Sequence, residues 1–171
     1  DYLARRQLTA QTVTRFGLGF APDTWDSLVR AMKALGYSEQ ELFDGGLVRH
    51  GRSGGVYDTF RNRLMFPVID VRGNVIGFSG RILGDGEPKY MNSPETIVFS
   101  KSHNLFALNL AKKSKCGYII LAEGNIDVAS LHQAGFDSAV ASLGTSLTPE
   151  QARLLSRYTG EIVIAYDNDG A

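Results

Sequence analysis

Three acidic residues in the last third of the chain have the types and spacing of a divalent-metal site. Glu123 ends one apolar run, and Asp167 and Asp169 follow a later one. Residues two apart in an extended chain point to the same side, so Asp167 and Asp169 can face one ion together. Neighbouring parallel strands lie only ~4.8 Å apart, which can bring Glu123 close to them. Carboxylates gathered in this way repel one another unless a cation lies among them.

Oxygen ligands of this kind suit Mg²⁺ or Mn²⁺, whereas zinc prefers histidine and cysteine. The three histidines, His50, His103 and His132, do not cluster in the sequence, and we expect them at the surface. The acidic pattern therefore favours metal-dependent phosphoryl chemistry. An alternative stays open at this point, in which Glu123 caps the next helix and the two aspartates belong to a polar turn.

The elements that must position these acids alternate between strand and helix. Strands are expected at 118–122, 138–141 and 162–166, and helices at 126–134 and from Thr148 onward. Thr148, Pro149 and Gln151 are typical of a capped helix start. Continuous apolar strands separated by helices predict a parallel sheet that is covered on both faces. Ligands bind such sheets beyond the carboxyl ends of the strands, where Glu123 and Asp167 lie.

The first two thirds of the chain predict short helices followed by antiparallel strands. Helices are expected at 9–16, at 24–35 with Asp23 as the cap and Gly36 as the stop, after the capping box that starts at Ser38, and at 104–113. Strands are expected at 64–71 and 75–83, joined by a turn at 72–74, with a loop at 84–96. In the second helix, Leu28, Met32 and Leu35 are expected to share one apolar face.

The composition excludes several classes of protein. With 171 residues and 43% hydrophobic content, the chain can form one domain or two small ones. No apolar run is long enough to cross a membrane, and the single cysteine, Cys116, fits a reducing cytoplasm and a packing role. We expect a cytoplasmic monomer with no membrane partner. The first residues do not form a signal peptide, and the chain is expected to be a piece of a longer protein.

A net charge of zero conceals an uneven distribution of charge. Residues 47–115 contain 11 Lys and Arg against 5 Asp and Glu, whereas residues 116–171 contain 2 against 7. A basic middle beside an acidic end is what a phosphate-binding surface next to a carboxylate cluster would require. Chance segregation of charge is an equally good explanation of these numbers alone.

The ordered series of motifs resembles a known family. Glu123-Gly124 after one strand and Asp-x-Asp after a later one resemble the Toprim domain of DnaG-type primases, topoisomerases and some nucleases. The segments 61–68, 73–81, 88–96 and 99–106 look like the RNA-polymerase domain of bacterial DnaG-type primases. The resemblance implies an α+β amino-terminal subdomain, residues 1–115, packed on an α/β Toprim-like subdomain, residues 116–171. The second subdomain is expected to have a parallel sheet with helices on both faces and to be cut short at its carboxyl end.

The resemblance also implies roles for particular residues. Glu123, Asp167 and Asp169 would hold the catalytic Mg²⁺ or Mn²⁺, with Asp127 and Gly124 in support. Seven residues match the family's positions for nucleic acid and nucleotide: Arg61, Arg63, Arg81, Lys89, Tyr90, Asn92 and Lys101. A simpler interpretation of Asp127 is a solvated acid in the first turn of a helix, where the helix dipole favours it. A simpler interpretation of Gly124 is a glycine at a helix start. A solvated basic face is the simpler interpretation of any single cation.

By this resemblance the protein would synthesise short RNA primers at the replication fork. Its partners would be single-stranded DNA, ribonucleoside triphosphates and, through a carboxy-terminal domain outside this chain, the replicative helicase. Zinc would belong only to a further domain outside the chain. Position 125 is Asn where such primases typically carry an aromatic residue, a departure that concerns the local packing and not the metal chemistry. We expect the chain alone to bind metal weakly and to make little or no primer.

Two other functions remain open from the residues. A Toprim nuclease or topoisomerase would share the acids, but no tyrosine here is marked as an activated nucleophile. A non-catalytic DNA-binding module would use the acids only as polar turns. Metal titration separates this last function from the other two.

Overall fold

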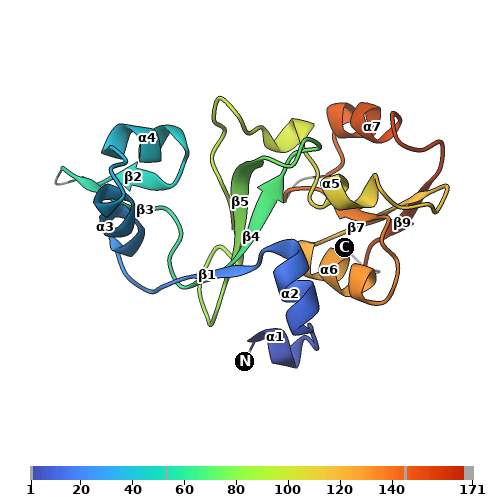
Figure 1. Ribbon diagram of the computed structural model, residues 1–171, viewed down its shortest axis with the longest axis horizontal. Coiled ribbons are helices and arrows are strands. Elements are labelled where there is room, and N and C mark those ends of the chain that lie inside the picture. Colours follow the sequence, from blue (N-terminus) through green and yellow to red (C-terminus); the bar gives the residue numbers. More distant parts are fainter. Residues whose placement is uncertain (1, 53, 145, 168–171) are drawn as a thin grey trace.

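The computed structural model describes residues 2–52, 54–144 and 146–167. Figure 1 shows a small helical lobe on the left, an antiparallel sheet in the centre and a parallel sheet with its helices on the right. No helix in these ranges is long and apolar enough to span a membrane. Asp169, one of the predicted ligands, lies outside the described residues.

The left lobe consists of α3 (Ser27–Ala34), α4 (Glu39–Asp44) and the antiparallel pair β2 (Val48–His50) and β3 (Val56–Asp58). It has its own small core of Val29, Leu42 and Val48. The Ser38 capping box starts α4 as predicted, because the Ser38 hydroxyl accepts from Glu41 N–H and the Glu41 carboxylate accepts from Ser38 N–H.

The prediction for α3 was wrong at its start and on its buried face. The helix begins at Ser27, and its N-terminal amides at Leu28 and Val29 donate to the carboxylate of Asp58 on β3, at 2.8 and 3.0 Å. Asp23 therefore does not cap it. Leu35 is 73% exposed, since the helix ends before it.

The central sheet has the order β1-β4-β5-β6 and is antiparallel. Its strands are β1 (Gly19–Ala21), β4 (Arg63–Ile69), β5 (Val75–Ile82) and β6 (Tyr90–Asn92). The predicted hairpin between β4 and β5 is present. The predicted loop at 84–96 is wrong in part, because three of its residues pair with β5 as β6. The helices α1 (Tyr2–Arg5) and α2 (Ala10–Phe16) precede this sheet in the chain.

The parallel sheet has the order β8-β7-β9, with β7 (Ile119–Ala122) in the middle. Its flanking strands are β8 (Ala139–Ala141) and β9 (Ile162–Ala165), and its helices are α5 (Leu108–Ala111), α6 (Asn125–Gln133) and α7 (Pro149–Leu155). The predicted helix at 104–113 is shorter than expected: a 3₁₀ turn, η1 (Lys101–His103), precedes it and only α5 is helical. The parallel alternation predicted from the sequence is confirmed.

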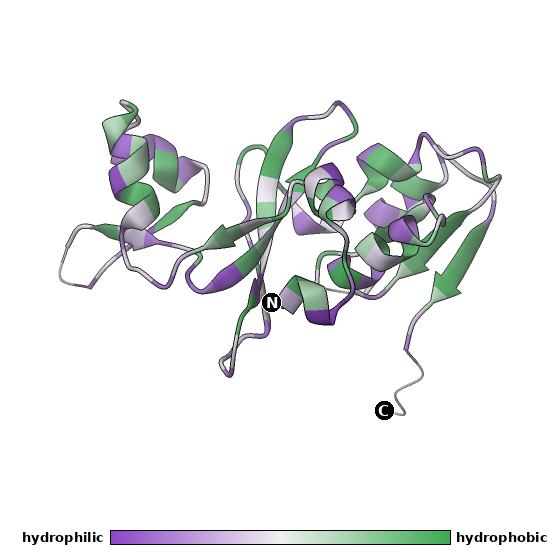
Figure 2. Ribbon diagram, turned by 60° about the horizontal axis from the view of Figure 1, so that its bottom comes forward, coloured by the Kyte–Doolittle hydropathy of each residue, from purple (hydrophilic) through white to green (hydrophobic). Residues whose placement is uncertain are grey.

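Two apolar cores enclose β7 and β8. Ile120 and Ala122 of β7 belong to the larger core, which extends to Phe66 of β4 and Phe106. Ile119 and Leu121 belong to the second core, with α5 and α7. By contrast, every residue of β9 is exposed, so the prediction that both faces of the sheet are covered is wrong for this strand. Figure 2 shows β9 as a hydrophobic strand at the outer edge of the molecule.

His132 is buried, against the expectation that all three histidines lie at the surface; His50 and His103 are exposed. Its ring lies edge-on to Phe16 of α2, with 5.1 Å between the ring centroids. Its Nε2–H donates to the carbonyl of Ala139 at 2.9 Å. The imidazole therefore joins α2, α6 and β8. Burial lowers the pKa of His132.

Candidate functional site

Three of the predicted acids, Glu123, Asp127 and Asp167, line one cleft of about 660 Å³ between the central sheet and the carboxyl edge of the parallel sheet. Its lining comes from the residue after α1, from β5 and β6, from the ends of β7 and β9, from the start of α6 and from the segment after β8. The lining residues are Arg6, Ser79, Lys89, Tyr90, Asn92, Glu123, Gly124, Asn125, Ile126, Asp127, Ser142, Leu143, Gly144, Ser146, Tyr166 and Asp167. Seven of the twelve residues singled out from the sequence are in this set.

Glu123 and Asp167 reach the cleft because their strands are adjacent and in register. Ala122 of β7 pairs with Ala165 of β9, so both strands end at the same level. Both carboxylates are exposed to solvent. Within the described ranges, neither accepts a hydrogen bond or forms an ion pair that would compensate its charge.

Asp127 lies in the first turn of α6 and faces the same two acids. Its carboxylate accepts from the backbone N–H of Gly124 at 3.0 Å, which satisfies one free amide at the helix start. Partial burial raises the pKa of Asp127, and the charges of Asp167 and Glu123 raise it further. Asp127 is thus a helix cap and also a member of the acidic cluster.

Gly124 contributes space and not backbone freedom. Its φ of −132° is open to any residue. A Cβ atom at this position would lie 3.0 Å from Oδ2 of Asp127. The missing side chain therefore allows the Asp127 carboxylate to close onto the backbone.

Lys89, Tyr90 and Asn92 line the opposite wall of the cleft, on β6 and just before it. The side-chain amide of Asn92 donates to the carbonyl of Leu143 at 2.9 Å, which ties β6 to the segment after β8. A Cβ atom at Gly144, whose φ is +75°, would lie 2.9 Å from this amide nitrogen. Lys89 forms no ion pair within the described ranges, so its charge is free for an anion.

Arg81 lies behind Tyr90 and does not line the cleft. Its guanidinium carbon is 4.3 Å from the ring centroid of Tyr2 and 5.8 Å from that of Tyr90. Stacking of this kind fixes the orientation of the aromatic rings. Burial raises the pKa of Tyr90, so its hydroxyl stays protonated at neutral pH.

The other three predicted cations lie away from the cleft. Arg61 covers the ring of Trp25 at 4.1 Å in the left lobe. Arg63 is only 4% exposed and donates to the carbonyls of Gly80 and Pro88, both at 3.0 Å. Lys101 lies in η1, where its backbone N–H donates to Glu95 and its carbonyl accepts from Gln151. None of these three residues lines the cleft that contains the acids.

The donor set fits a hard divalent cation. Exposed carboxylates from two adjacent strand ends line the same cleft, and oxygen ligands without histidine or cysteine suit Mg²⁺ or Mn²⁺. Residues 2–52, 54–144 and 146–167 contain no group of three or more potential ligands close enough to hold an ion. The third predicted ligand, Asp169, lies outside those ranges, so the described residues supply only part of the predicted set.

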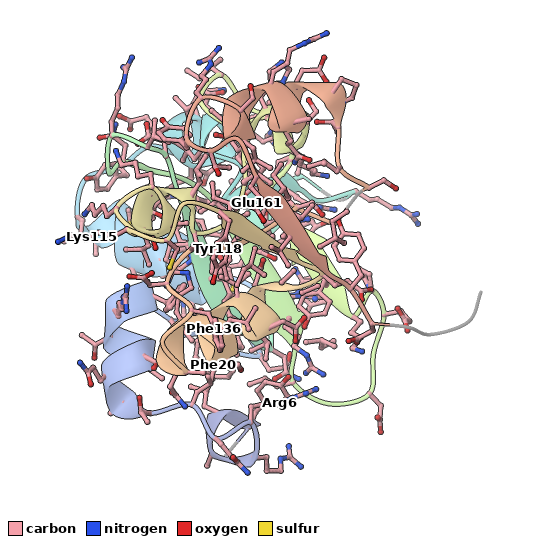
Figure 3. The ribbon with its side chains drawn as sticks, turned by 90° about the vertical axis from the view of Figure 1, so that its right-hand side faces the viewer. Arg6, Phe20, Lys115, Tyr118, Phe136 and Glu161 are labelled. Carbon is pink, nitrogen blue, oxygen red and sulfur yellow. The ribbon has the colours of Figure 1, made fainter. Side chains whose placement is uncertain are left out.

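Sequence reasoning missed Arg6, which follows α1 directly and lines the cleft. Its Nε donates to the Tyr2 hydroxyl at 3.0 Å, and its charge lowers the pKa of Asp127. Figure 3 labels it at the lower end of the molecule. Arg6 is far from the acids in sequence and belongs to no chemical motif. Its place in the cleft follows only from the packing of the N-terminal helices.

Comparison with known proteins places these features in a family. Residues 1–112 match the model described as "DNA primase catalytic core, N-terminal domain", and residues 120–171 match the model described as "Toprim-like". The chain is 52% identical to a DNA primase of Clostridium acetobutylicum, covering 99% of the chain and 28% of that protein. It is 46% identical to one of Deinococcus radiodurans, covering 100% and 31%. The chain thus spans only about three tenths of these relatives.

Solved structures agree with the fold. The Escherichia coli primase catalytic core superposes with a TM-score of 0.90 at 42% identity, covering 99% of this chain and 55% of that one. The RNA polymerase domain of Mycobacterium tuberculosis primase DnaG superposes with a TM-score of 0.92 at 38% identity, covering 99% and 58%. A DnaG primase catalytic domain bound to single-stranded DNA has a TM-score of 0.87 at 43% identity, covering 98% and 55%. The chain therefore belongs to the DNA primase catalytic core family, with a Toprim-like region at residues 120–171.

Proposed function

We propose that this chain forms the metal-binding and template-binding part of a bacterial DNA primase, which makes short RNA primers on single-stranded DNA. One observation carries the proposal: Glu123 and Asp167 leave adjacent strands and enter a cleft whose other wall holds Lys89. Relatives that are named DNA primase, and one whose structure holds single-stranded DNA, support it. The cytoplasm, the replication fork and the replicative helicase are proposed as its setting on the same grounds.

Glu123, Asp167 and Asp169 would hold Mg²⁺ or Mn²⁺ at the acidic edge. A bound ion there would offset the charge of an incoming triphosphate and favour ionisation of the attacking 3′-hydroxyl. The chain's own residues would do the rest. Lys89 and Arg6 would bind phosphate oxygens, the Tyr90 ring would stack on an unpaired base, and Asp127 would keep α6 in place below the acids.

The two subdomains, residues 1–115 and 116–171, are proposed to divide this work. The first subdomain would guide template and nucleotide. In it, Asn92 would hold the backbone at Leu143 through its hydrogen bond, and Arg81 would orient the Tyr90 ring. Arg61 and Lys101, which lie outside the cleft, would contact template further along its path. Arg63 is proposed to serve the same surface indirectly, since its guanidinium is engaged by two carbonyls. The second subdomain would hold the metal and the reacting groups.

A ribonucleotide-incorporation assay with the complete gene product on single-stranded DNA tests the proposal. Glu123→Gln and Asp167→Asn should each lower incorporation by at least about a hundredfold, because each removes a charge that the transition state requires. Glu161→Gln is the matched control. Glu161 is an exposed acid just before β9, outside the cleft lining, and Figure 3 labels it. No incorporation by the parent would refute primase activity.

Metal titration separates catalysis from passive DNA binding. Mn²⁺ binding followed by electron paramagnetic resonance should weaken in Glu123→Gln and Asp167→Asn and stay unchanged in Glu161→Gln. If all three variants bind Mn²⁺ like the parent, the acids are not ligands. The protein would then be a DNA-binding module with an acidic turn.

A further inference from the structure

One glutamine connects helix α6 with the two N-terminal helices. Gln133 is the last residue of α6, and its side chain reaches the segment between α1 and α2. Its Oε1 accepts from the backbone N–H of Thr9 and from the hydroxyl of Thr12, both at 2.8 Å. Its Nε2 donates to the carbonyl of Gln7, also at 2.8 Å. All three of these hydrogen bonds join the Gln133 amide to residues 7–12.

That segment contains an unfavourable backbone conformation. Gln7 has a φ of +55°, in the left-handed region that residues other than glycine rarely adopt. Gln7 lies two residues after the end of α1; its N–H donates to the carbonyl of Ala4, and that of Leu8 donates to the carbonyl of Leu3. A strained residue persists only where its surroundings hold it in place. The amide of Gln133, which binds the Gln7 carbonyl and the next turn together, supplies such a hold.

Arg6 directly precedes this turn and lines the cleft. Asp127, in the first turn of α6, lines the same cleft, and Gln133 is the last residue of that helix. The first turn of α6 thus lines the cleft. The last residue of α6, Gln133, binds the segment that directly follows Arg6. Phe16 against His132 is a second contact between α2 and α6. Because Arg6 adjoins Gln7 in the chain, a change in the turn at Gln7 would redirect the Arg6 side chain.

We propose that Gln133 is a positioning residue that acts through Arg6. It holds the left-handed turn at Gln7 and so places the Arg6 guanidinium for phosphate oxygens in the cleft. This inference rests on the proposed function, because it assigns a phosphate-bearing ligand to the same cleft. The phosphates belong either to the incoming nucleoside triphosphate or to the DNA template, and the experiment distinguishes the two.

The experiment is a double-mutant cycle in the complete gene product with Gln133→Leu and Arg6→Ala. Three quantities are measured at 25 °C: the KM for ATP during incorporation, kcat, and the Kd of a fluorescent single-stranded oligonucleotide. Gln133→Leu should raise the KM or the Kd about tenfold, the size of a lost charge-assisted hydrogen bond, and change kcat less. A rise in KM alone assigns Arg6 to the nucleotide, and a rise in Kd alone assigns it to the template.

In the Arg6→Ala background the added effect of Gln133→Leu should fall below twofold, since the group that it positions is gone. Gln7→Gly should restore most of the loss in Gln133→Leu, because glycine adopts the left-handed conformation unaided. Gln40→Leu, at an exposed glutamine of α4 outside the cleft, is the control and should match the parent.

A tenfold loss that persists in the Arg6→Ala background, or that Gln7→Gly does not relieve, would show that Gln133 acts only on general stability. No loss in Gln133→Leu would also overturn the proposal. If the parent incorporates no ribonucleotide, the primase proposal fails, and the oligonucleotide Kd still reports the coupling of Gln133 to Arg6.

Discussion

Replacement of Arg63 by methionine should destabilise the fold more than it weakens contacts with DNA. The side chain is 4% exposed, and one terminal nitrogen donates to both Gly80 on β5 and Pro88 before β6. It therefore ties the β4–β5 hairpin to the segment that carries Lys89 and Tyr90. Burial lowers the pKa of Arg63, and the nearby charge of Arg61 lowers it further, but a guanidinium stays protonated at neutral pH.

The magnitude follows from the two hydrogen bonds. Each bond from a charged donor contributes about 1.5–3 kcal/mol, and the desolvation of the buried charge offsets part of the sum. Methionine fills a similar space but donates to neither carbonyl. We expect a net loss of about 3 kcal/mol in the free energy of unfolding, which corresponds to a decrease of roughly 6–12 °C in Tm.

Urea unfolding followed by circular dichroism measures this loss, and a fluorescent oligonucleotide measures DNA affinity below the transition. Lys89→Met is the matched control, because Lys89 is exposed in the cleft. It should change stability by less than about 0.5 kcal/mol and lower the affinity. If Arg63→Met unfolds like the parent and loses affinity like Lys89→Met, Arg63 is a DNA contact and the reasoning from its burial is refuted.

Three further changes test other parts of the fold. Asp58→Ala removes the acceptor for the Leu28 and Val29 amides and should destabilise the left lobe by about 2 kcal/mol, seen as faster exchange of the α3 amides; unchanged exchange would contradict the cap. Gly80→Ala should lower Tm by several degrees, because its Cβ would lie 2.9 Å from Arg63 and from Phe60, and a parent-like Tm would refute that crowding. His132 binds its proton more weakly in the folded protein, so the unfolded chain takes up more protons as the pH falls below about 6.5. The free energy of unfolding should therefore decrease there by at most about 1.4 kcal/mol per pH unit. His132→Gln should remove that part of the pH dependence of Tm, and an identical pH profile in both proteins would exclude His132 as its source.

Features that depend on neighbours in sequence were predictable. The capping boxes at Ser38 and Thr148 form as expected, because each needs only residues within one turn of helix. The hairpin around Gly73 forms for the same reason. The parallel order β8-β7-β9 followed from continuous apolar strands separated by helices. That order alone puts Glu123 and Asp167 at one edge.

Features that depend on distant residues were not predictable. The cap of α3 comes from Asp58, 31 residues after Ser27 in the sequence, so the local candidate Asp23 gave the wrong start. His132 is buried because Phe16 of α2 covers it, and the sequence pattern of α6 does not indicate that α2 packs against it. Arg6 enters the cleft only through tertiary packing. Arg61 stacks on Trp25 instead of facing the acids, which its sequence motif could not reveal.

The two strands that carry the cleft acids differ in how firmly their neighbours support them. β7 is packed from both sides, so the backbone that leads to Glu123 has little room to adjust, whereas β9 is exposed along its whole length. Elements with few buried contacts open and shift at lower free-energy cost. If Glu123 and Asp167 are ligands as proposed, a cation in the cleft would have one ligand on a fixed backbone and one on an adaptable backbone. Tolerance for ions of different radius, Mg²⁺ against the larger Mn²⁺, would then depend on how far the Asp167 end can move towards Glu123.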